Sequence, residues 1–192
     1  MDTDLPASEP VSLVAGAVRA LLSDADHRQA RALLAKIDGD LLLRQQRAAL
    51  LAVRSVPRAR VDIPRRNVSI REQQAVFDAD SWTCRYCGRL TIARDVCFEL
   101  QRLRAWSYYR AGPPKWWHAI GYTYLATVDH VWPRLDDSGN LVTACWQCQA
   151  AKNSRPLTGL AHLGWRLQDR THREWKGLND SVNRLRVLPP GR

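Results

Sequence analysis

The chain has 192 residues, with 29 Lys or Arg against 19 Asp or Glu, and therefore a formal net charge of +10. A chain of this length can bury a core without a disulfide framework, and a hydrophobic content of 45% excludes wholesale disorder. No apolar run is long enough to cross a bilayer, and the acidic first residues are unlike a basic signal peptide, so we expect a cytoplasmic protein that makes no membrane contact.

The basic charge is dominated by Arg and is unevenly distributed. Arg accounts for 25 of the 29 basic residues, and its planar guanidinium binds phosphate through paired hydrogen bonds, as a nucleic-acid surface requires. G+C-rich codon usage is the alternative explanation. Residues 1–40 carry four basic and seven acidic side chains, whereas residues 41–75 carry eight and two. We expect DNA as the partner, held mainly by basic segments rather than by base-specific contacts.

Residues 1–64 contain no Trp, Tyr, Phe or Cys and predict a helical segment that ends in a basic linker. An apolar repeat at helical spacing over residues 11–22 predicts the first helix. Ser23 and Asp26 predict the start of a second helix, which Gly39 would end. The apolar faces of these helices offer a surface for pairing two copies, so we expect a homodimer through them.

Asp40 predicts the start of a third helix, because its side chain can accept a hydrogen bond from a free backbone N–H. One face of this helix is apolar, and the other carries Arg44, Arg47 and Arg54. Pro57 and Pro64 bracket a basic stretch that leads to Arg65 and Arg66. We expect Arg65 and Arg66 to contact nucleic acid, whereas a solvated surface is the alternative for any single Arg of the helix face.

From residue 65 the chain gains aromatic residues and cysteines, and residues 65–160 predict a second, mixed domain. Ser69 and Glu72 form a capping-box pattern that opens a short helix. Residues 95–106 predict another helix, and residues 122–128 have the composition of a strand.

Beyond this strand the sequence predicts a turn, a second extended piece from Asn140 and a short helix. Residues 161–192 predict a basic helical extension at the C-terminal side. The expected fold class is therefore α+β, with helices on either side of a small sheet in the sequence.

Four of the five cysteines form two Cys-x-x-Cys pairs, which together supply the four thiolates of a structural zinc site. The pairs are Cys84/Cys87 and Cys145/Cys148, with 57 residues between them. A redox role is the weaker alternative, because neither pair has the strand–helix context of a thioredoxin-like motif. Cys97 is left over and is expected to be a buried structural thiol.

Asp129 and His130 place a hard carboxylate next to an imidazole at the end of the predicted strand. The carboxylate suits Mg²⁺ or Mn²⁺, and the imidazole can take a proton from water at neutral pH. A structural His is the commoner explanation for such a pair in isolation. Asn140 follows ten residues after His130, however, and the second cysteine pair comes shortly after it. Because adjacent strand residues point to opposite sides, a bulge or the strand end would be needed to bring both to one site.

Four elements occur in a fixed order: Trp82-Thr-Cys84-Arg-Tyr-Cys87-Gly, Val128-Asp129-His130-Val-x-Pro133, Asn140-Leu-Val-Thr-Ala-Cys145-x-x-Cys148, and Lys152. In this order they resemble the HNH (His-Asn-His) endonuclease family in its four-cysteine zinc variety. The resemblance covers roughly residues 65–160. It implies a ββα-metal core stapled by a structural zinc, with one catalytic Mg²⁺ or Mn²⁺.

The resemblance also implies residue roles. His130 would activate water, Asp129 would bind the ion, and Asn140 would brace the loop that orients His130. The helix after Cys148 normally supplies a further His or Asn ligand, and here Gln149 departs from that pattern. Asn153 lies one helical turn further on and is the alternative ligand.

Positive side chains near this motif are candidates for holding the phosphate. Lys152 and Arg155 are expected to contact it, although helix C-terminal charge compensation is an equal alternative for Arg155. Trp116, Trp117 and His118 precede the motif; packing is the favoured role, with an approach of His118 to the metal site as the alternative.

We therefore expect a metal-dependent HNH endonuclease that hydrolyses phosphodiester bonds in DNA. The alternatives are a catalytically weak or inactive zinc-stabilised DNA-binding protein and an RNA-cleaving nuclease.

Overall fold

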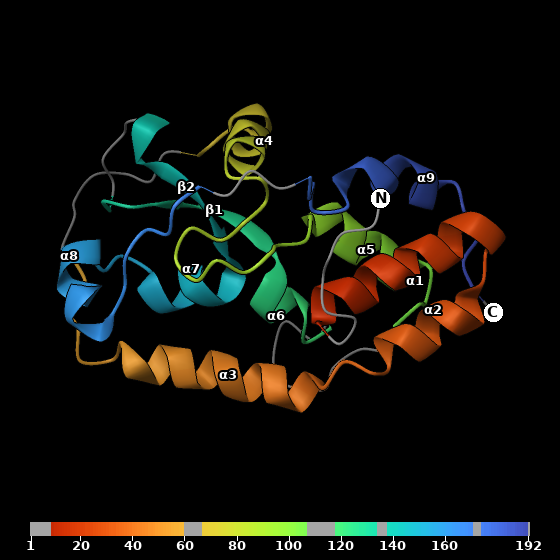
Figure 1. Ribbon diagram of the computed structural model, residues 1–192, viewed down its shortest axis with the longest axis horizontal. Coiled ribbons are helices and arrows are strands. Elements are labelled where there is room, and N and C mark those ends of the chain that lie inside the picture. Colours follow the sequence, from red (N-terminus) through yellow and green to blue (C-terminus); the bar gives the residue numbers. More distant parts are fainter. Residues whose placement is uncertain (1–8, 60–66, 107–117, 134–137, 171–173, 192) are drawn as a thin grey trace.

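The computed structural model describes residues 9–59, 67–106, 118–133, 138–170 and 174–191, and its fold is a mixture of helices with one small antiparallel sheet (Figure 1). The α-helices and strands in chain order are α1 (Pro10–Asp24), α2 (His27–Leu34), α3 (Gly39–Ala52), α4 (Ile70–Ala79), α5 (Arg94–Arg102), α6 (Gly121–Tyr124), β1 (Ala126–His130), β2 (Leu141–Cys145), α7 (Trp146–Lys152), α8 (Leu157–Leu160) and α9 (Val182–Arg186). Short 3₁₀ turns lie at Ser138–Asn140, Ala161–Leu163 and Asn179–Ser181.

The three predicted N-terminal helices are confirmed, but their caps differ from the prediction. Ser23 donates to the carbonyl of Arg19 and lies inside α1, whereas Asp26 caps α2 by accepting from the N–H of Gln29 at 2.8 Å. Asp38, not Asp40, caps α3, so that Gly39 begins this helix instead of ending the previous one. In each case an Asp two or three residues away offers a better-placed acceptor.

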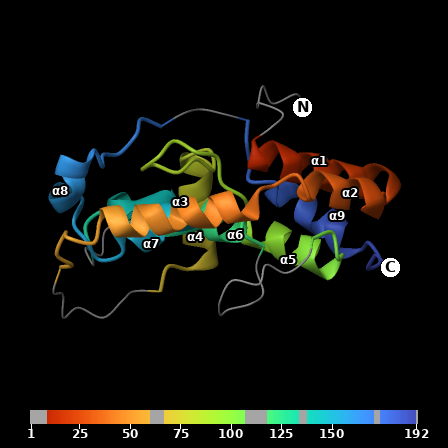
Figure 2. The ribbon, with the colours of Figure 1, turned by 90° about the horizontal axis from the view of Figure 1, so that it is seen from below.

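Helix α3 runs along one side of the molecule and lies against α6 and α7, as the view from below makes clear (Figure 2). Gln147 of α7 donates to the carbonyl of Gln45 at 3.3 Å, and Arg155 donates to the carbonyl of Val56 at 2.8 Å. These bonds fix α3 and the segment after it to the helix that carries the second cysteine pair.

The capping box of Ser69 and Glu72 is present and opens α4, as predicted. The helix expected over residues 95–106 is also present as the shorter α5. Residues 121–124 form the one-turn helix α6, because the N–H of Tyr124 bonds to the carbonyl of Ile120, and the strand begins two residues later than Tyr124. Local hydrogen bonding thus outweighs the strand propensity of the tyrosines.

The sheet consists of β1 and β2, which pair from Ala126 opposite Cys145 to His130 opposite Leu141. Helices α4 and α7 both contact the two strands, and the sheet lies between them in Figure 1. All five residues of β2 are buried, as expected for a strand covered on both faces. The hairpin followed by α7 is the ββα order that the sequence predicts.

One hydrophobic cluster draws on all three expected segments of the chain. It includes Val14 of α1, Phe77 of α4, and Trp175 and Leu185 near the C-terminal side. The last segment is only partly helical: between Gly164 and Leu178 its described residues cross the first cysteine loop as extended or irregular chain. The N-terminal helices are therefore packed into the common core.

The apolar face of α1, which the sequence predicts as a dimer surface, is used within the chain. Val11, Val14 and Leu21 are each fully buried. The exposed apolar side chains of the N-terminal segment lie instead on α3, where Leu50 is 42% and Leu51 is 56% exposed. Among the described residues no helix is both long and apolar enough to cross a membrane.

Candidate functional site

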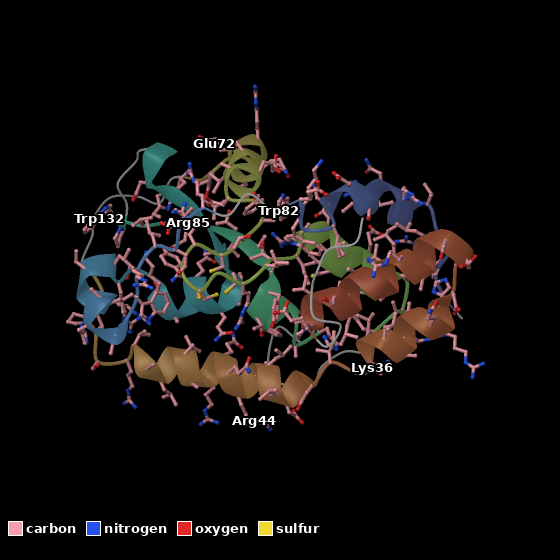
Figure 3. All side chains as sticks on the ribbon, viewed as in Figure 1. Lys36, Arg44, Glu72, Trp82, Arg85 and Trp132 are labelled. Carbon is pink, nitrogen blue, oxygen red and sulfur yellow. The ribbon has the colours of Figure 1, made fainter. Side chains whose placement is uncertain are left out.

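The four predicted cysteine ligands come together into one cluster. The sulfur atoms of Cys84, Cys87, Cys145 and Cys148 all lie within 4.8 Å of one another. Cys87 Sγ and Cys145 Sγ are 3.9 Å apart, close to the roughly 3.8 Å that two sulfurs of a tetrahedral zinc site adopt at Zn–S distances of about 2.3 Å. The sulfurs gather above α7 in Figure 3. The described residues contain no other cluster of three His, Cys, Asp or Glu side chains that could hold a metal ion.

Two local structures aim these thiols at one point. Gly88 adopts a φ of +71°, which lets the loop turn back so that its N–H bonds to the carbonyl of Cys84. The backbone N–H of Arg89 bonds to Cys87. Cys145 is the N-cap of α7, where the helix dipole favours a thiolate.

Mutual hydrogen bonding separates the thiol pKa values. The bond from Cys145 lowers the pKa of Cys87, whereas the same kind of bond raises the pKa of Cys148. A zinc ion bound to four thiolates would replace this sharing of protons. The donor set and its geometry therefore fit a structural zinc ion.

A buried carboxylate that the sequence did not single out locks the first cysteine loop to the sheet. Asp80, 1% exposed, accepts from the N–H of Thr143 in β2 at 2.8 Å. Arg85 reaches Asp80 at 3.0 Å, and Arg170 reaches it at 3.1 Å. No short motif signals this cluster, because Arg170 comes from a segment 90 residues further along the chain.

Asp129 is the second buried carboxylate, and its neighbours determine what it can do. The hydroxyl of Tyr86 donates to Asp129 Oδ2 at 2.7 Å, and Lys152 Nζ lies 3.0 Å from the same oxygen. Burial raises the pKa of Asp129, while the charge of Lys152 opposes that shift. Burial, and next the charge of Asp129, raise the pKa of Tyr86, so the phenol remains the donor.

His130 is the last residue of β1, and the strand pairing reaches it without a bulge. Alternation along the strand therefore sends the side chains of Asp129 and His130 toward opposite faces of the sheet. The His130 carbonyl accepts from Lys152 Nζ at 2.6 Å. The imidazole is half-buried.

Asn140 binds the turn that follows His130 from both sides. Its Oδ1 accepts from the N–H of Trp132 at 2.7 Å, and its Nδ2 donates to the carbonyl of Trp132 at 2.8 Å. The side chain is 4% exposed. The Asn140 side chain therefore holds the backbone of Trp132 in place.

The structure separates the two candidate ligands on α7. Gln149 lies along β1, where its Nε2 donates to the carbonyl of Val128 at 2.9 Å, directly before Asp129. Asn153 is exposed beyond the end of α7, and its Oδ1 accepts from the N–H of Ser154. Of the two candidates, only Gln149 is bonded to the backbone next to Asp129.

The basic residues that the sequence predicts as phosphate contacts lie in different environments. Lys152 is 0% exposed and bonded to Asp129 and His130, so its ammonium lies inside the site. Arg155 is 7% exposed and donates to the carbonyls of Val56 and Ala151, which favours a structural role over a phosphate contact. Arg65 and Arg66 lie outside the described residues.

The remaining candidates are packing residues. His118 stacks on Trp106 with ring centroids 5.0 Å apart, and burial lowers its pKa to about 4. Trp116 and Trp117 lie outside the described residues. Cys97 is 2% exposed, and burial raises its pKa to about 12, as expected of an inert thiol.

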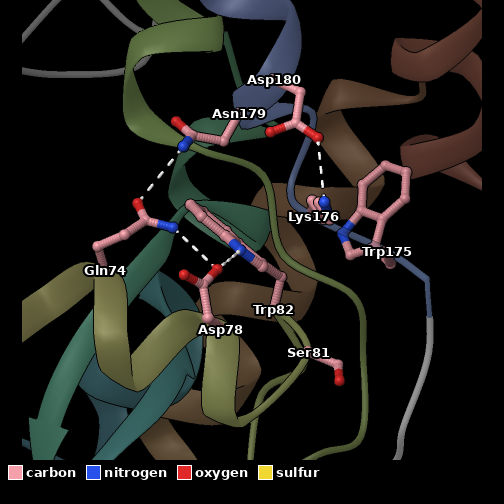
Figure 4. A pocket seen from close by; sticks show the side chains of 8 residues that line it. All are labelled: Gln74, Asp78, Ser81, Trp82, Trp175, Lys176, Asn179 and Asp180. Atoms are coloured by element: carbon pink, nitrogen blue, oxygen red, sulfur yellow. Dashed lines mark hydrogen bonds and ion pairs between the residues drawn. The ribbon is translucent and has the colours of Figure 1, made fainter.

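A pocket of about 260 Å³ lies where the C-terminal segment crosses α4 (Figure 4). Its polar groups bond to one another: Asp78 accepts from both Gln74 and Trp82, and Lys176 pairs with Asp180 at 3.6 Å. Beside it, Gly177 packs so closely on Trp82 that an added Cβ would lie 2.1 Å from the indole. This region holds the C-terminal segment on the cysteine loop.

Two oxygen atoms beside Asp129 have the chemistry of ligands for a hard metal ion. Asp129 Oδ1 and Gln149 Oε1 accept no hydrogen bond from the described residues, and both are oxygen donors of the type that Mg²⁺ and Mn²⁺ take. The Lys152 ammonium already balances the carboxylate charge. These two oxygen atoms are therefore the donors beside Asp129 that could hold such an ion.

In comparisons by sequence and by fold, no family model, curated protein or solved structure matches the chain.

Proposed function

We propose that the chain is a metal-dependent endonuclease of the HNH type that hydrolyses phosphodiester bonds in DNA. The observation that carries the proposal is the position of Asp129 and His130 at the end of the first strand of a hairpin that leads into α7. Asn140 supports it by holding the turn after His130 from both sides. The four-cysteine cluster joins the first cysteine loop to the start of α7, and we assign it a structural zinc ion.

In the proposed reaction each residue has a separate task. His130 accepts a proton from the attacking water, and Asn140 keeps the His130 loop in place. Asp129 and Gln149 hold a divalent ion, Mg²⁺ or Mn²⁺, which when bound supplies positive charge to the phosphate and to the leaving oxygen. The positive charge of Lys152 opposes the rise in the Asp129 pKa that burial causes, and so favours the carboxylate form.

DNA is proposed as the substrate because of charge on the outer face of α3 and the segment after it. Arg44, Arg47, Arg54 and Arg58 are all exposed, and residues 41–59 contain no Asp or Glu. Arg44 projects away from the body of the protein in Figure 3. Because Gln147 and Arg155 fix this region to the rest of the fold, phosphates bound here would be held at a constant position relative to α7.

A second candidate function is supported by the same Lys152–Asp129 pair. A carboxylate that is already neutralised by an internal ammonium has less affinity for an added ion. Together with Gln149 in place of the family's His or Asn, this favours a catalytically weak protein that binds DNA without cutting it.

The test is cleavage of plasmid DNA by purified protein with Mg²⁺ and separately with Mn²⁺. Wild-type protein should nick or linearise the plasmid, and His130→Ala protein with unchanged zinc content should not. Structured RNA in parallel reactions decides between DNA and RNA as the substrate. DNA binding with no cleavage under any divalent ion would favour the binding-protein alternative.

A further inference from the structure

Tyr86 connects the cysteine cluster to Asp129. It lies between the two cysteines of the first pair, so its backbone is held by the loop that carries Cys84 and Cys87. Its side chain is 6% exposed and ends on Asp129 Oδ2, 43 residues further along the chain. A single side chain therefore joins the two parts of the candidate site.

The Tyr86 ring has little freedom to move. Trp165 packs on it with ring centroids 5.6 Å apart, and Lys152 Nζ lies 5.9 Å from the ring centroid. Its hydroxyl position is consequently set by the cysteine loop and by these neighbours. A buried ring fixed in this way holds its hydrogen-bond partner in one orientation.

The hydrogen bond also decides which carboxylate oxygen remains available. Tyr86 and Lys152 both bond to Oδ2 of Asp129, and no described residue bonds to Oδ1. Without the phenol, Lys152 would be the only donor, and the carboxylate could rotate so that both oxygens face the ammonium. The Tyr86 hydroxyl thus keeps both carboxylate oxygens of Asp129 from turning toward the Lys152 ammonium.

We propose that Tyr86 is a positioning residue that sets Asp129 Oδ1 toward the divalent ion and thereby makes ion binding depend on the folded cysteine loop. This inference rests on the proposed function, because it assigns a divalent ion to Asp129. It assigns a further role to the cysteine cluster: besides stabilising the fold, the cluster sets the geometry of the acidic ligand.

The experiment compares Tyr86→Phe with wild-type protein and with Tyr124→Phe. Tyr86→Phe removes one oxygen and keeps the ring against Trp165. Tyr124 is the matched control, since its ring lies beside the cysteine loop under Arg89 at 4.8 Å and no described residue bonds to its hydroxyl. Three quantities are measured: zinc content, Mn²⁺ affinity by spin-resonance titration, and plasmid cleavage as a function of Mn²⁺ concentration.

Tyr86→Phe should retain one zinc per chain and bind Mn²⁺ about 10-fold more weakly, the usual loss when a partner of a metal ligand is removed. Saturating Mn²⁺ should restore most of its cleavage, and Tyr124→Phe should match wild type in all three measurements.

Unchanged Mn²⁺ affinity in Tyr86→Phe would overturn the inference and leave the nuclease proposal intact. Loss of zinc by Tyr86→Phe would also overturn it, because the hydroxyl would then serve the cysteine loop itself. A wild-type protein that neither binds Mn²⁺ nor cleaves nucleic acid would overturn the proposed function and this inference together.

Discussion

The cysteine cluster and the Asp129 site are neighbours that balance their charges in opposite ways. In the cluster four sulfur atoms face one another, with the Arg89 guanidinium close enough for Cys87 to raise its pKa. At Asp129 a single carboxylate already has an ammonium and a phenol on the same oxygen. The four thiolates would need an added cation to balance their charge, whereas the Asp129 carboxylate is already balanced by Lys152.

This difference has a physical consequence for how the two sites use metal. Four thiolates repel one another unless an ion joins them, so zinc binding and folding are coupled. The Asp129 carboxylate is already paired with Lys152. We therefore expect the divalent ion proposed there to be held weakly and to exchange. In the proposed function the cysteine cluster would hold a permanent ion and Asp129 an exchangeable one.

The largest effect is expected from removing one ligand of the cysteine cluster. Cys84→Ser should abolish zinc binding and unfold the protein, because a structural zinc site contributes about 10 kcal/mol or more of binding free energy to folding. Elemental analysis and far-UV circular dichroism measure both effects. Cys97→Ser is the matched control and should retain one zinc per chain. Folded, reduced wild-type protein without zinc would contradict the assignment.

Removing the candidate base, His130, should leave the cysteine cluster unchanged. His130→Ala should reduce cleavage by about 10²–10⁴-fold, since a positioned general base contributes that much to the rate. Zinc content and thermal stability should match the wild type. Retention of full cleavage by His130→Ala would exclude His130 as the base.

Lys152→Met tests whether the Lys152 ammonium balances the charge of the buried Asp129 carboxylate. Leaving one member of a buried ion pair alone costs about 3–5 kcal/mol, so the free energy of unfolding should fall by that order. Mn²⁺ should recover more stability in this variant than in wild type, because it takes over the role of the ammonium. Thermal denaturation with and without Mn²⁺ measures this difference. Lys176→Met, which removes the exposed pair with Asp180, is the control and should change little.

A further set of variants tests whether Gln149 or Asn153 is the second oxygen ligand of the proposed ion. Gln149→Ala should raise the Mn²⁺ concentration needed for half-maximal cleavage by about 10-fold, whereas Gln149→Asn should have a smaller effect. Asn153→Ala should behave like wild type, because its side chain is engaged with Ser154. The reverse result would move the ligand to the end of α7.

The smallest expected effect concerns the basic face of α3. The double variant Arg44→Gln and Arg47→Gln should reduce the slope of log K against log salt concentration by roughly 2, about 0.9 for each lost phosphate contact. Fluorescence anisotropy with duplex DNA at several salt concentrations measures the slope. Arg184→Gln on α9 is the control at the other end of the molecule. An unchanged slope in the double variant would place the DNA elsewhere.

The sequence predicts the parts of this protein that depend on local spacing. The two Cys-x-x-Cys pairs, the capping box at Ser69, and the hairpin–helix order around Asn140 all follow from residues close together in the chain. Local competition explains the errors: Asp38 replaced Asp40 as a cap, and the tyrosines before Leu125 formed a helical turn.

The contacts that set the chemistry at Asp129 could not be predicted in the same way. Tyr86 reaches Asp129 across 43 residues, and Lys152 turns inward although a Lys near the end of a helix is ordinarily solvated. Burial of a charged group depends on the packing of several elements, and no pattern in one of them reports it. The sequence leaves two roles open for Arg155 for the same reason, since its partner Val56 lies 99 residues away.

The way the C-terminal segment crosses the first cysteine loop has a consequence for synthesis of the chain. Trp175 donates to the carbonyl of Thr91, Gly177 lies on Trp82, and Leu185 is fully buried in the common core. During translation the helices and both cysteine pairs emerge before the residues that cover them. The core can therefore close only after residue 185 has left the ribosome, and a nascent chain arrested earlier would present Trp82 to chaperones and proteases.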